Sequence, residues 1–330
     1  MAERFAVLGA GAWGTAVAIH LAKLGHAVSL WAARGESAAR LFAARENLPL
    51  LPGVPIPDKI AVTADSDEAT RNTDNWIVAI PTAFLRPTLS RFIELATSRT
   101  RCLSLTKGIE VGSFLRPSEI IAETLAVKTV AALSGPSHAE EMARGLPTSV
   151  VVAGTDREFA ATIQHAFGTA RFRVYTNRDL IGLELGGALK NVLGIAAGIC
   201  DGLGFGDNAK SALLTRSIVE MTRFGVALGA EAATFAGLAG IGDLMTTCFS
   251  RHGRNRRVGE RLGRGEPLDA ILAGPQVAEG VYTAKSVRQR SLALGLDVPI
   301  MSAVYDVLYE GKSPLAAVQD LMARQMREEG

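Results

Sequence analysis

The chain has 330 residues, of which 48% are hydrophobic, and its formal net charge is +2. This length is sufficient for two domains with separate cores, and the hydrophobic content excludes an intrinsically disordered chain. The nearly balanced charge does not indicate a nucleic-acid or membrane-surface binder, so we expect small-molecule partners and no nucleic acid.

The three cysteines, Cys102, Cys200 and Cys248, are widely separated and form no Cys-x-x-Cys pair. This pattern indicates neither a zinc site nor a disulfide framework, and it suits a reducing compartment. The first expected strand begins at Arg4, which leaves no room for a signal peptide, and no apolar run reaches the roughly 20 residues of a spanning helix. We therefore expect a cytoplasmic protein without a metal and without an integral membrane segment.

A short apolar run at residues 4–8 leads directly into a Gly-x-Gly-x-x-Gly pattern at Gly9, Gly11 and Gly14. In such a pattern the first glycine permits a tight turn, the second lets the backbone approach a pyrophosphate, and the third lets the next helix pack against the strand. The phosphates then lie at the helix N-terminus, which attracts anions. The pattern predicts a dinucleotide site, with a simple strand-to-helix turn as the alternative.

The first half of the chain alternates between apolar strand patterns and helix patterns. Strands are expected at 4–8, 27–31, 76–80, 101–106, 129–134, 149–153 and 172–175, with helices at 13–24 and 156–167. Continuous apolar strands are typical of a parallel sheet that is covered on both faces. We predict an α/β fold with a Rossmann-type, doubly wound, mainly parallel sheet domain over residues 1–178.

The second half shows helix periods interrupted by glycines and no strand-like alternation. Helices are expected at 180–200, 208–228, 283–294, 299–310 and 313–327. We predict an all-helical domain over residues 179–330. In this arrangement the ligand cleft is expected between the two domains, at the carboxyl ends of the strands.

The end of the second expected strand reads Trp31-Ala32-Ala33-Arg34. An NAD-specific site usually carries Asp or Glu there, which bonds the ribose 2′-hydroxyl. The missing carboxylate and the presence of Arg34 make NADP acceptable, while Glu36 keeps NAD open. Arg34 is alternatively a solvated loop residue.

Lys190 is a single cation in the small, apolar helix pattern of residues 183–198. Either its side chain reaches solvent along its neighbours, or it is packed next to a ligand and transfers a proton. Glycines one turn away favour packing. Burial would lower the pKa of the lysine, and nearby carboxylates would oppose that shift.

Two expected strand ends carry further polar groups, Lys107 after one and Gly135 with Ser137 after another. Lys107 could hold an anion, and Gly135 could allow a close backbone approach. Ser137 could bond a substrate or cap the next helix, where Glu140 would complete a capping box.

Asp243 precedes an arginine-rich segment, residues 251–257, which contains Arg251, Arg254, Arg256 and Arg257. Four arginines in seven residues make a candidate anion site, with a solvated helix face as the alternative. The flanking glycines favour a bent loop. No aromatic residues are interleaved, as a nucleic-acid groove would require.

Taken together, these motifs resemble the bacterial soluble glycerol-3-phosphate dehydrogenase family, NAD(P)-dependent enzymes that reduce dihydroxyacetone phosphate for phospholipid synthesis. The resemblance spans almost the whole chain. It rests on Gly-Ala-Gly-Ala-Trp-Gly-Thr at 9–15, Thr-Lys-Gly at 106–108, Ser-Gly-Pro-Ser at 134–137, Gly-Ala-Leu-Lys-Asn at 187–191, Gly-Asp-Leu at 242–244 and Arg-Asn-Arg-Arg at 254–257.

The resemblance implies that Lys190 is the proton donor and acceptor. Substrate contacts are implied for Lys107, Gly135, Ser137, Lys190, Asp243, Gly253, Arg254 and Asn255. Cofactor contacts, with NADP or NAD, are expected at Gly9, Gly11, Ala12, Trp13, Gly14, Arg34, Lys107, Ala139, Arg254, Val277 and Glu279. Gly253 departs from the family, which commonly has Ser there, so only a backbone contact is expected from it.

Two other functions remain open at this stage. One is another two-domain dehydrogenase of the hydroxyacid type, which also pairs a nucleotide domain with a helical one. The other is a sensor that binds NAD(P)H without turnover and therefore does not need Lys190 or Asp243. A homodimer is also left open.

Overall fold

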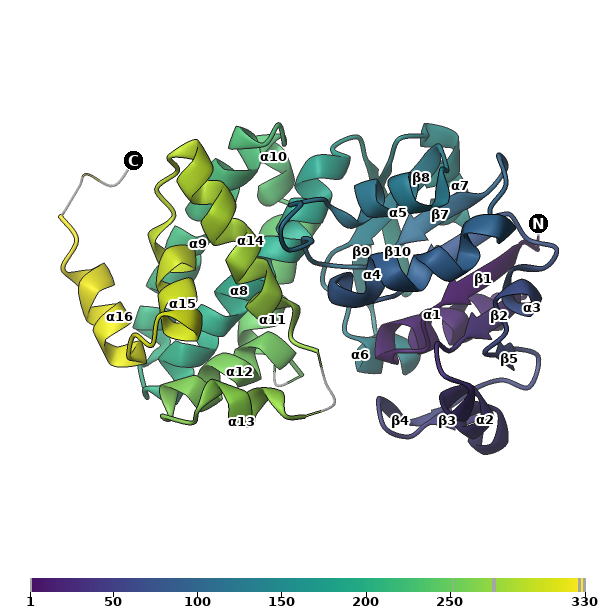
Figure 1. Cartoon of the computed structure of the whole chain (residues 1–330), viewed down its shortest axis with the longest axis horizontal. Helices are drawn as coiled ribbons and strands as arrows, with labels where there is room; N and C mark the ends of the chain where they lie inside the picture. The colour runs from purple at the N-terminus through teal and green to yellow at the C-terminus, as the bar shows by residue number, and fades with distance from the viewer. Residues whose placement is uncertain (1, 251, 275–276, 326–327, 329–330) are drawn as a thin grey trace. The chain divides into compact units, whose positions relative to one another are not determined.

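The computed structural model describes residues 2–250, 252–274, 277–325 and 328. By its internal contacts the chain forms two units (Figure 1). Unit 1 comprises Met1–Lys107 and Leu115–Glu184, and unit 2 comprises Gly108–Phe114 and Leu185–Gly330. The short excursion 108–114 into unit 2 has no counterpart in the expected organisation. The domain boundary expected at 178/179 stays a prediction.

Unit 1 is built on an eight-stranded sheet with the strand order β10-β9-β8-β7-β6-β1-β2-β5. All neighbouring strands are parallel except β8 and β9, which are antiparallel, so the predicted mainly parallel Rossmann-type sheet is confirmed. The strands are β1 (Arg4–Leu8), β2 (Ala27–Trp31), β5 (Ala61–Thr63), β6 (Asn75–Val78), β7 (Arg101–Ser104), β8 (Thr129–Ser134), β9 (Thr148–Gly154) and β10 (Phe172–Asn177); β3 (Glu46–Asn47) and β4 (Leu51–Pro55) form a separate pair.

Helices bury both faces of this sheet, which is why its strands read as continuous apolar runs. Phe5 and Val7 of β1 lie in one core with α1, α2, α6 and α7, whereas Ala6 and Leu8 lie in another with α3, α4 and α5. The helices are α1 (Ala12–Lys23), α2 (Gly35–Ala44), α3 (Ser66–Thr70), α4 (Thr82–Leu89), the 3-10 helix η1 (Ser90–Leu95), α5 (Pro117–Leu125), α6 (Ala139–Ala143) and α7 (Arg157–Phe167).

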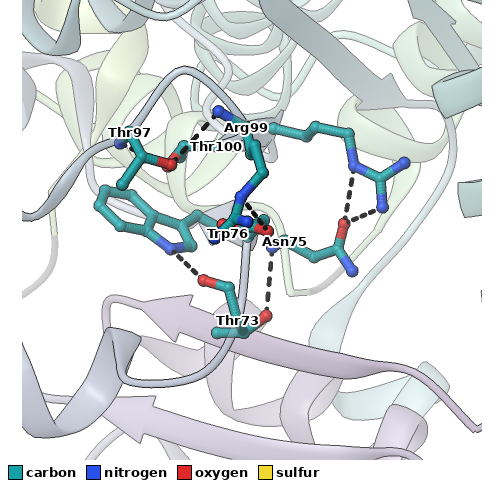
Figure 2. A network of polar contacts seen from close by, with 8 residues as sticks. Thr73, Asn75, Trp76, Thr97, Arg99 and Thr100 are labelled. Atoms are coloured by element: carbon teal, nitrogen blue, oxygen red, sulfur yellow. Dashed lines mark hydrogen bonds and ion pairs between the residues drawn. The ribbon is translucent and has the colours of Figure 1, made fainter.

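A polar network ties the loops together at the amino ends of β6 and β7 (Figure 2). Asn75 donates its backbone N–H to the Thr73 hydroxyl (3.1 Å) and accepts on Oδ1 from Arg101 Nη2 (2.7 Å), while Trp76 Nε1 donates to Thr73 O (3.1 Å). The turn 97–100 is closed by a bond from Thr97 N to the Thr100 hydroxyl (2.9 Å). These bonds hold the loops at this edge of the sheet to one another.

Unit 2 contains helices and no strand among the residues that the structure describes. They are α8 (Leu180–Gly202, which begins in unit 1), α9 (Asp207–Ala227), α10 (Ala232–Phe235), the π-helical turn η2 (Leu238–Gly242), α11 (Asp243–Phe249), α12 (Arg254–Gly263), α13 (Leu268–Leu272), α14 (Glu279–Leu294), α15 (Pro299–Tyr309) and α16 (Pro314–Met322). The predicted helical character is confirmed. The expected end of the last helix, at Arg327, lies outside the described residues.

Two described segments, Leu180–Gly202 and Ala232–Phe249, are long and apolar enough to cross a membrane, judged by length and composition alone. The expectation that no apolar run is long enough to span a membrane is therefore wrong for these two segments. In α8, 89% of the most apolar window is buried within the fold, as in the core helix of a globular domain. Length and composition alone are weak evidence for a membrane segment, because the buried core helix of a globular domain shares them.

Candidate active site

The turn between β1 and α1 has the geometry expected for a dinucleotide loop. Gly9 has φ +119°, and a Cβ on it would lie 2.6 Å from Ala79 O; a Cβ on Gly14 would lie 2.0 Å from Gly9 O. Neither position tolerates a side chain, because backbone atoms fill the space. Gly11 differs, since nothing lies within 4 Å of a Cβ there. The open space at Gly11 fits the close approach of a phosphate to the backbone.

Two further observations suit a ligand at this loop. Gly11 is the N-cap of α1 and makes no side-chain cap hydrogen bond, so no side chain of the N-cap satisfies the first-turn N–H groups. Trp13 Nε1 is a buried donor without a hydrogen-bond partner in the part of the chain that the structure describes. A buried, unpaired donor costs free energy unless a ligand or water satisfies it. The loop therefore fits an NAD(P) pyrophosphate.

Lys107, Gly135 and Ser137 lie together in unit 1, as predicted. Lys107 Nζ donates to Gly135 O (2.9 Å) and to Ser137 Oγ (3.4 Å). Gly135 has φ +127°, and a Cβ there would lie 3.1 Å from Val150 Cα, so glycine is required. The three residues form a small polar cluster at the carboxyl ends of β7 and β8.

The capping box expected at Ser137 is wrong. Helix α6 begins at Ala139 with His138 as its N-cap, and no side-chain cap bond forms. The Ser137 hydroxyl instead donates to Gly135 O (2.8 Å), because the chain stays extended for one more residue before the helix starts. The Ser137 hydroxyl therefore belongs to the cluster of Lys107 and Gly135.

Lys190 and Asp243 form a buried ion pair in unit 2. Their relative exposures are 8% and 1%, and Lys190 Nζ lies 2.5 Å from Asp243 Oδ1. The alternative in which Lys190 reaches solvent is therefore wrong. Gly186 explains the contact, since a Cβ on it would lie 2.5 Å from Ala239 O. The small residue lets α8 touch the η2 turn that delivers Asp243.

A chain of amides lies beside this pair. Asn255 Nδ2 donates to Asn191 Oδ1 (2.8 Å), and Gly280 N donates to Asn255 Oδ1 (3.0 Å). Asn255 thus joins the start of α12 to α8 and to the first turn of α14, which begins at Glu279. Asn191 was not among the predicted site residues. Its position directly after Lys190 in the sequence could have indicated it.

The arginine-rich segment is a helix start and not a bent loop, so that expectation is wrong. Gly253 is the N-cap of α12, and Arg254 stands exposed in its first turn. Arg256 instead turns to Asp201, with Nε 2.6 Å from Oδ2. Arg257 is exposed, and Arg251 lies outside the described residues. Among the described arginines of this segment, Arg256 is thus paired with a carboxylate, and Arg254 lies exposed directly before the buried Asn255.

The remaining predicted cofactor residues fall in two places. Ala12 and Ala139 open α1 and α6 in unit 1, and Arg34 is the exposed N-cap of α2. Val277 and Glu279 lie at or just before the start of α14 in unit 2.

Two family models cover nearly the whole chain. The N-terminal model of NAD-dependent glycerol-3-phosphate dehydrogenase matches residues 4–160, and the C-terminal model matches residues 179–319. The chain belongs to this family. A relative from Chlorobium limicola, named an NAD(P)+-dependent glycerol-3-phosphate dehydrogenase, is 48% identical over 328 residues, with 98% of each chain covered.

Solved structures of the family agree. The Coxiella burnetii glycerol-3-phosphate dehydrogenase superposes with a TM-score of 0.94 at 37% identity, covering 98% of this chain and 99% of that one. The Saccharomyces cerevisiae glycerol-3-phosphate dehydrogenase gives 0.82 at 27% identity and covers 98% and 100%. The recognised resemblance is thus confirmed, and this family member is an NAD(P)-dependent oxidoreductase.

Gly253 lies in a tightly packed turn. A Cβ at this position would lie 2.9 Å from Thr247 O and 3.2 Å from Ser250 O. A serine would need the backbone of the preceding turn to move by several tenths of an ångström. The turn in this structure therefore leaves no room for a side chain at residue 253.

Proposed function

We propose that this protein interconverts dihydroxyacetone phosphate and sn-glycerol 3-phosphate by hydride transfer, with Lys190 as general acid and base, and that it supplies glycerol 3-phosphate for glycerophospholipid synthesis. The observation that supports the mechanism is the buried ion pair of Asp243 with Lys190 of α8. Asn255, next in sequence to the exposed Arg254, contacts the same helix through Asn191. The substrate and reaction come from the family to which the chain belongs.

Lys190 donates and accepts the proton in the proposed reaction. When bound, NAD(P)H supplies the hydride to the ketone carbon. Negative charge then develops on the ketone oxygen, where the Lys190 ammonium stabilises and protonates it; in the reverse direction the amine accepts the proton. Asp243 fixes the direction of Nζ and offsets the cost of burying the ammonium.

Arg254 and Asn255 are proposed to bind the phosphate of the substrate. Both lie in the first turn of the ten-residue helix α12, and no side chain caps the start of this helix. The backbone N–H groups of the first turn and the helix dipole therefore add to the attraction of the guanidinium for a phosphate. A phosphate held away from the reacting carbon orients the carbonyl toward Lys190 and the hydride. Lys107, Gly135 and Ser137 are proposed as further substrate contacts, with a backbone contact from Gly253.

The nucleotide is proposed to bind at the glycine loop of unit 1. Gly9 and Gly14 shape the loop, Gly11 leaves the open space, and Trp13 supplies the unpaired donor. The full set of proposed cofactor contacts is Gly9, Gly11, Ala12, Trp13, Gly14, Arg34, Lys107, Ala139, Arg254, Val277 and Glu279.

An assay of NAD(P)H oxidation with dihydroxyacetone phosphate tests this function, with product identification as glycerol 3-phosphate. A 2-keto acid is the specificity control, since it lacks the phosphate that Arg254 would bind. Turnover of the keto acid alone would support the other two-domain dehydrogenase. Tight binding of NAD(P)H without turnover of either substrate would support the sensor.

We also propose that the protein is a cytoplasmic homodimer with a domain boundary near residue 178. These proposals rest on the resemblance and the sequence pattern. Light scattering on the purified protein checks the assembly, and a mass of one chain would contradict the dimer.

A further inference from the structure

The end of β2 lies beside the glycine loop. Strands β1 and β2 pair in parallel with Leu8 opposite Trp31, and Gly9 N donates to Trp31 O (3.0 Å). The loop after β1 and residues 32–34 after β2 therefore emerge at the same edge of the sheet. In dinucleotide sites of this kind the adenosine ribose lies at the end of the second strand.

A second arginine, from a distant part of the chain, is anchored at this strand end. Arg91 in η1 donates from Nη1 to Ala33 O (3.0 Å), and its Cζ lies 4.7 Å from the ring centroid of Trp31. Trp31 is fully buried and held edge-on against Phe92, with centroids 4.9 Å apart. The stacking surface is therefore rigid, and it fixes the plane of an exposed guanidinium.

The charges at this place favour an anion. A guanidinium has five N–H donors, so the single bond to Ala33 O leaves others for a ligand. Neither Arg34 nor Arg91 pairs with a carboxylate within residues 2–250 or elsewhere in the described chain. The segment 32–34 carries no acid, and Glu36, exposed in the first turn of α2, is the nearest one along it.

We propose that Arg91 completes, with Arg34, a binding site for the adenosine 2′-phosphate and so makes the protein select NADP over NAD. This inference rests on the proposed nucleotide position at the glycine loop. Two planar guanidinium groups match phosphate oxygens with charge-assisted hydrogen bonds. NAD carries a neutral hydroxyl at that place, which offers no anionic oxygen to pair with either guanidinium.

Steady-state kinetics of the Arg91→Ala variant with NADPH and with NADH test the proposal. The ratio of kcat/KM for NADPH to that for NADH should fall by about tenfold or more, as expected for losing charged hydrogen bonds. The loss should appear in the KM for NADPH, with kcat and the KM for NADH nearly unchanged. Arg91→Lys, which keeps the charge without the fork, should lose less.

Arg99 provides the matched control. It is an exposed arginine at the amino edge of the same sheet (Figure 2), with Nε 3.4 Å from Asp74 Oδ2. Arg99→Ala should leave the NADPH to NADH ratio unchanged. An equal loss with both cofactors in Arg91→Ala would show a purely structural role for Arg91, and an unchanged ratio would remove it from the site; either result overturns the proposal.

Fragment binding keeps the test decisive if Arg91→Ala does not fold or the wild type does not turn over. Adenosine 2′-monophosphate should bind the wild type more tightly than adenosine 5′-monophosphate, and added salt should weaken that preference. The absence of a preference would overturn the 2′-phosphate site. A preference without turnover would overturn the proposed dehydrogenase while leaving this site intact.

Discussion

At the residue scale, the ion pair of Lys190 and Asp243 lies where water has little access. Lys190 and Asp243 are 8% and 1% exposed, and each charge lies within bonding distance of the opposite charge of the other. A buried carboxylate at this distance orients the ammonium. This is the property that a proton donor to a ketone oxygen needs, because donor direction is part of the catalysis.

Lys190→Ala is expected to lower kcat by about two orders of magnitude or more, since a general acid is lost. Cofactor binding should persist, as measured by NADPH fluorescence. Lys210→Ala is the matched control, because Lys210 is also 8% exposed and paired with a carboxylate, that of Asp201. It should cost stability and leave kcat nearly unchanged. Near-normal turnover of Lys190→Ala would contradict the assignment.

Arg254→Ala is expected to raise the KM for dihydroxyacetone phosphate by roughly 10- to 100-fold, the range for a lost hydrogen bond to a charged group. Arg257, exposed one turn further along α12, is the control. Arg257→Ala should leave KM within about twofold, because the dipole and N–H groups act only at the first turn. Equal KM changes in both variants would show that the segment attracts phosphate only as a general positive field.

At the scale of elements, α8 and α12 meet through glycines. A Cβ on Gly198 would lie 1.9 Å from Arg256 O, and one on Gly259 would lie 1.9 Å from Ile195 O. The two backbones are therefore in direct contact, which no side chain could allow. This close approach holds the first turn of α12, with Arg254 and Asn255, against the helix that carries Lys190.

Gly259→Ala is expected to destabilise the fold by about 3 kcal/mol or more through overpacking. Helix propensity alone would predict the opposite sign, a gain of about 1 kcal/mol. Gly206→Ser is the control, because nothing lies within 4 Å of a Cβ at that N-cap and serine is favoured there. Urea unfolding measures both, and a stabilised Gly259→Ala would show that the helices are not in backbone contact.

Helices α9 and α15 are joined by a buried carboxylate. Glu220 accepts hydrogen bonds from Ile300 N (2.7 Å) and Met301 N (3.1 Å) at the start of α15. Burial raises the pKa of Glu220 to about 7, and the two N–H donors only partly oppose this. Between the ordinary value of 4.5 and about 7, the folded chain therefore holds a proton that the unfolded chain has released.

Because the folded state binds more protons in this window, the stability from Glu220 is present at low pH and lost as pH rises toward about 7. The loss amounts to about 3 kcal/mol at most. Glu220→Gln should show a flatter curve when free energies of unfolding by urea are compared at about pH 5 and about pH 8. Parallel curves for the two proteins would mean that Glu220 has an ordinary pKa.

At the scale of the whole molecule, the chain passes between the two units three times. After β7 it leaves unit 1 at Lys107, contributes 108–114 to unit 2, returns at Leu115 and leaves again after Glu184. Within unit 1, Glu184 Oε2 accepts from Arg116 Nη1 (2.7 Å), so the second and third passages are tied together. Within unit 2, Ser286 Oγ donates to Ile109 O (3.4 Å).

Because the segment Gly108–Phe114 belongs to unit 2, we expect its buried residues to stabilise that unit. Ile109 is 1% exposed, so Ile109→Ala should cost about 2–4 kcal/mol by leaving a cavity. Val111 in the same segment is 45% exposed, and Val111→Ala should stay within about 0.5 kcal/mol. Hydrogen exchange should show the loss in α14 before the sheet. Equal effects of the two substitutions would argue against a buried contribution from this segment.

Several parts of this molecule followed from the sequence alone. Strands such as β1 and β8 are buried on both faces, so their apolar runs identified the sheet. The glycines that follow β1 likewise identified the tight turn into α1. The edge strand β5 has three residues and carries too little signal. At Ser137 the local pattern of a capping box was complete, yet α6 starts at Ala139, one residue later than that box requires, and the Ser137 hydroxyl bonds within the Lys107 cluster instead.

The sequence by itself determined the alternation of elements, the glycine positions and the presence of one cation in an apolar helix, since each is a property of neighbouring residues. Only the tertiary structure decided that Lys190 meets Asp243, 53 positions away, and that Arg256 pairs with Asp201. It also brought Arg91 to the end of β2. Such contacts depend on how helices cross and where loops close, which short-range patterns do not specify.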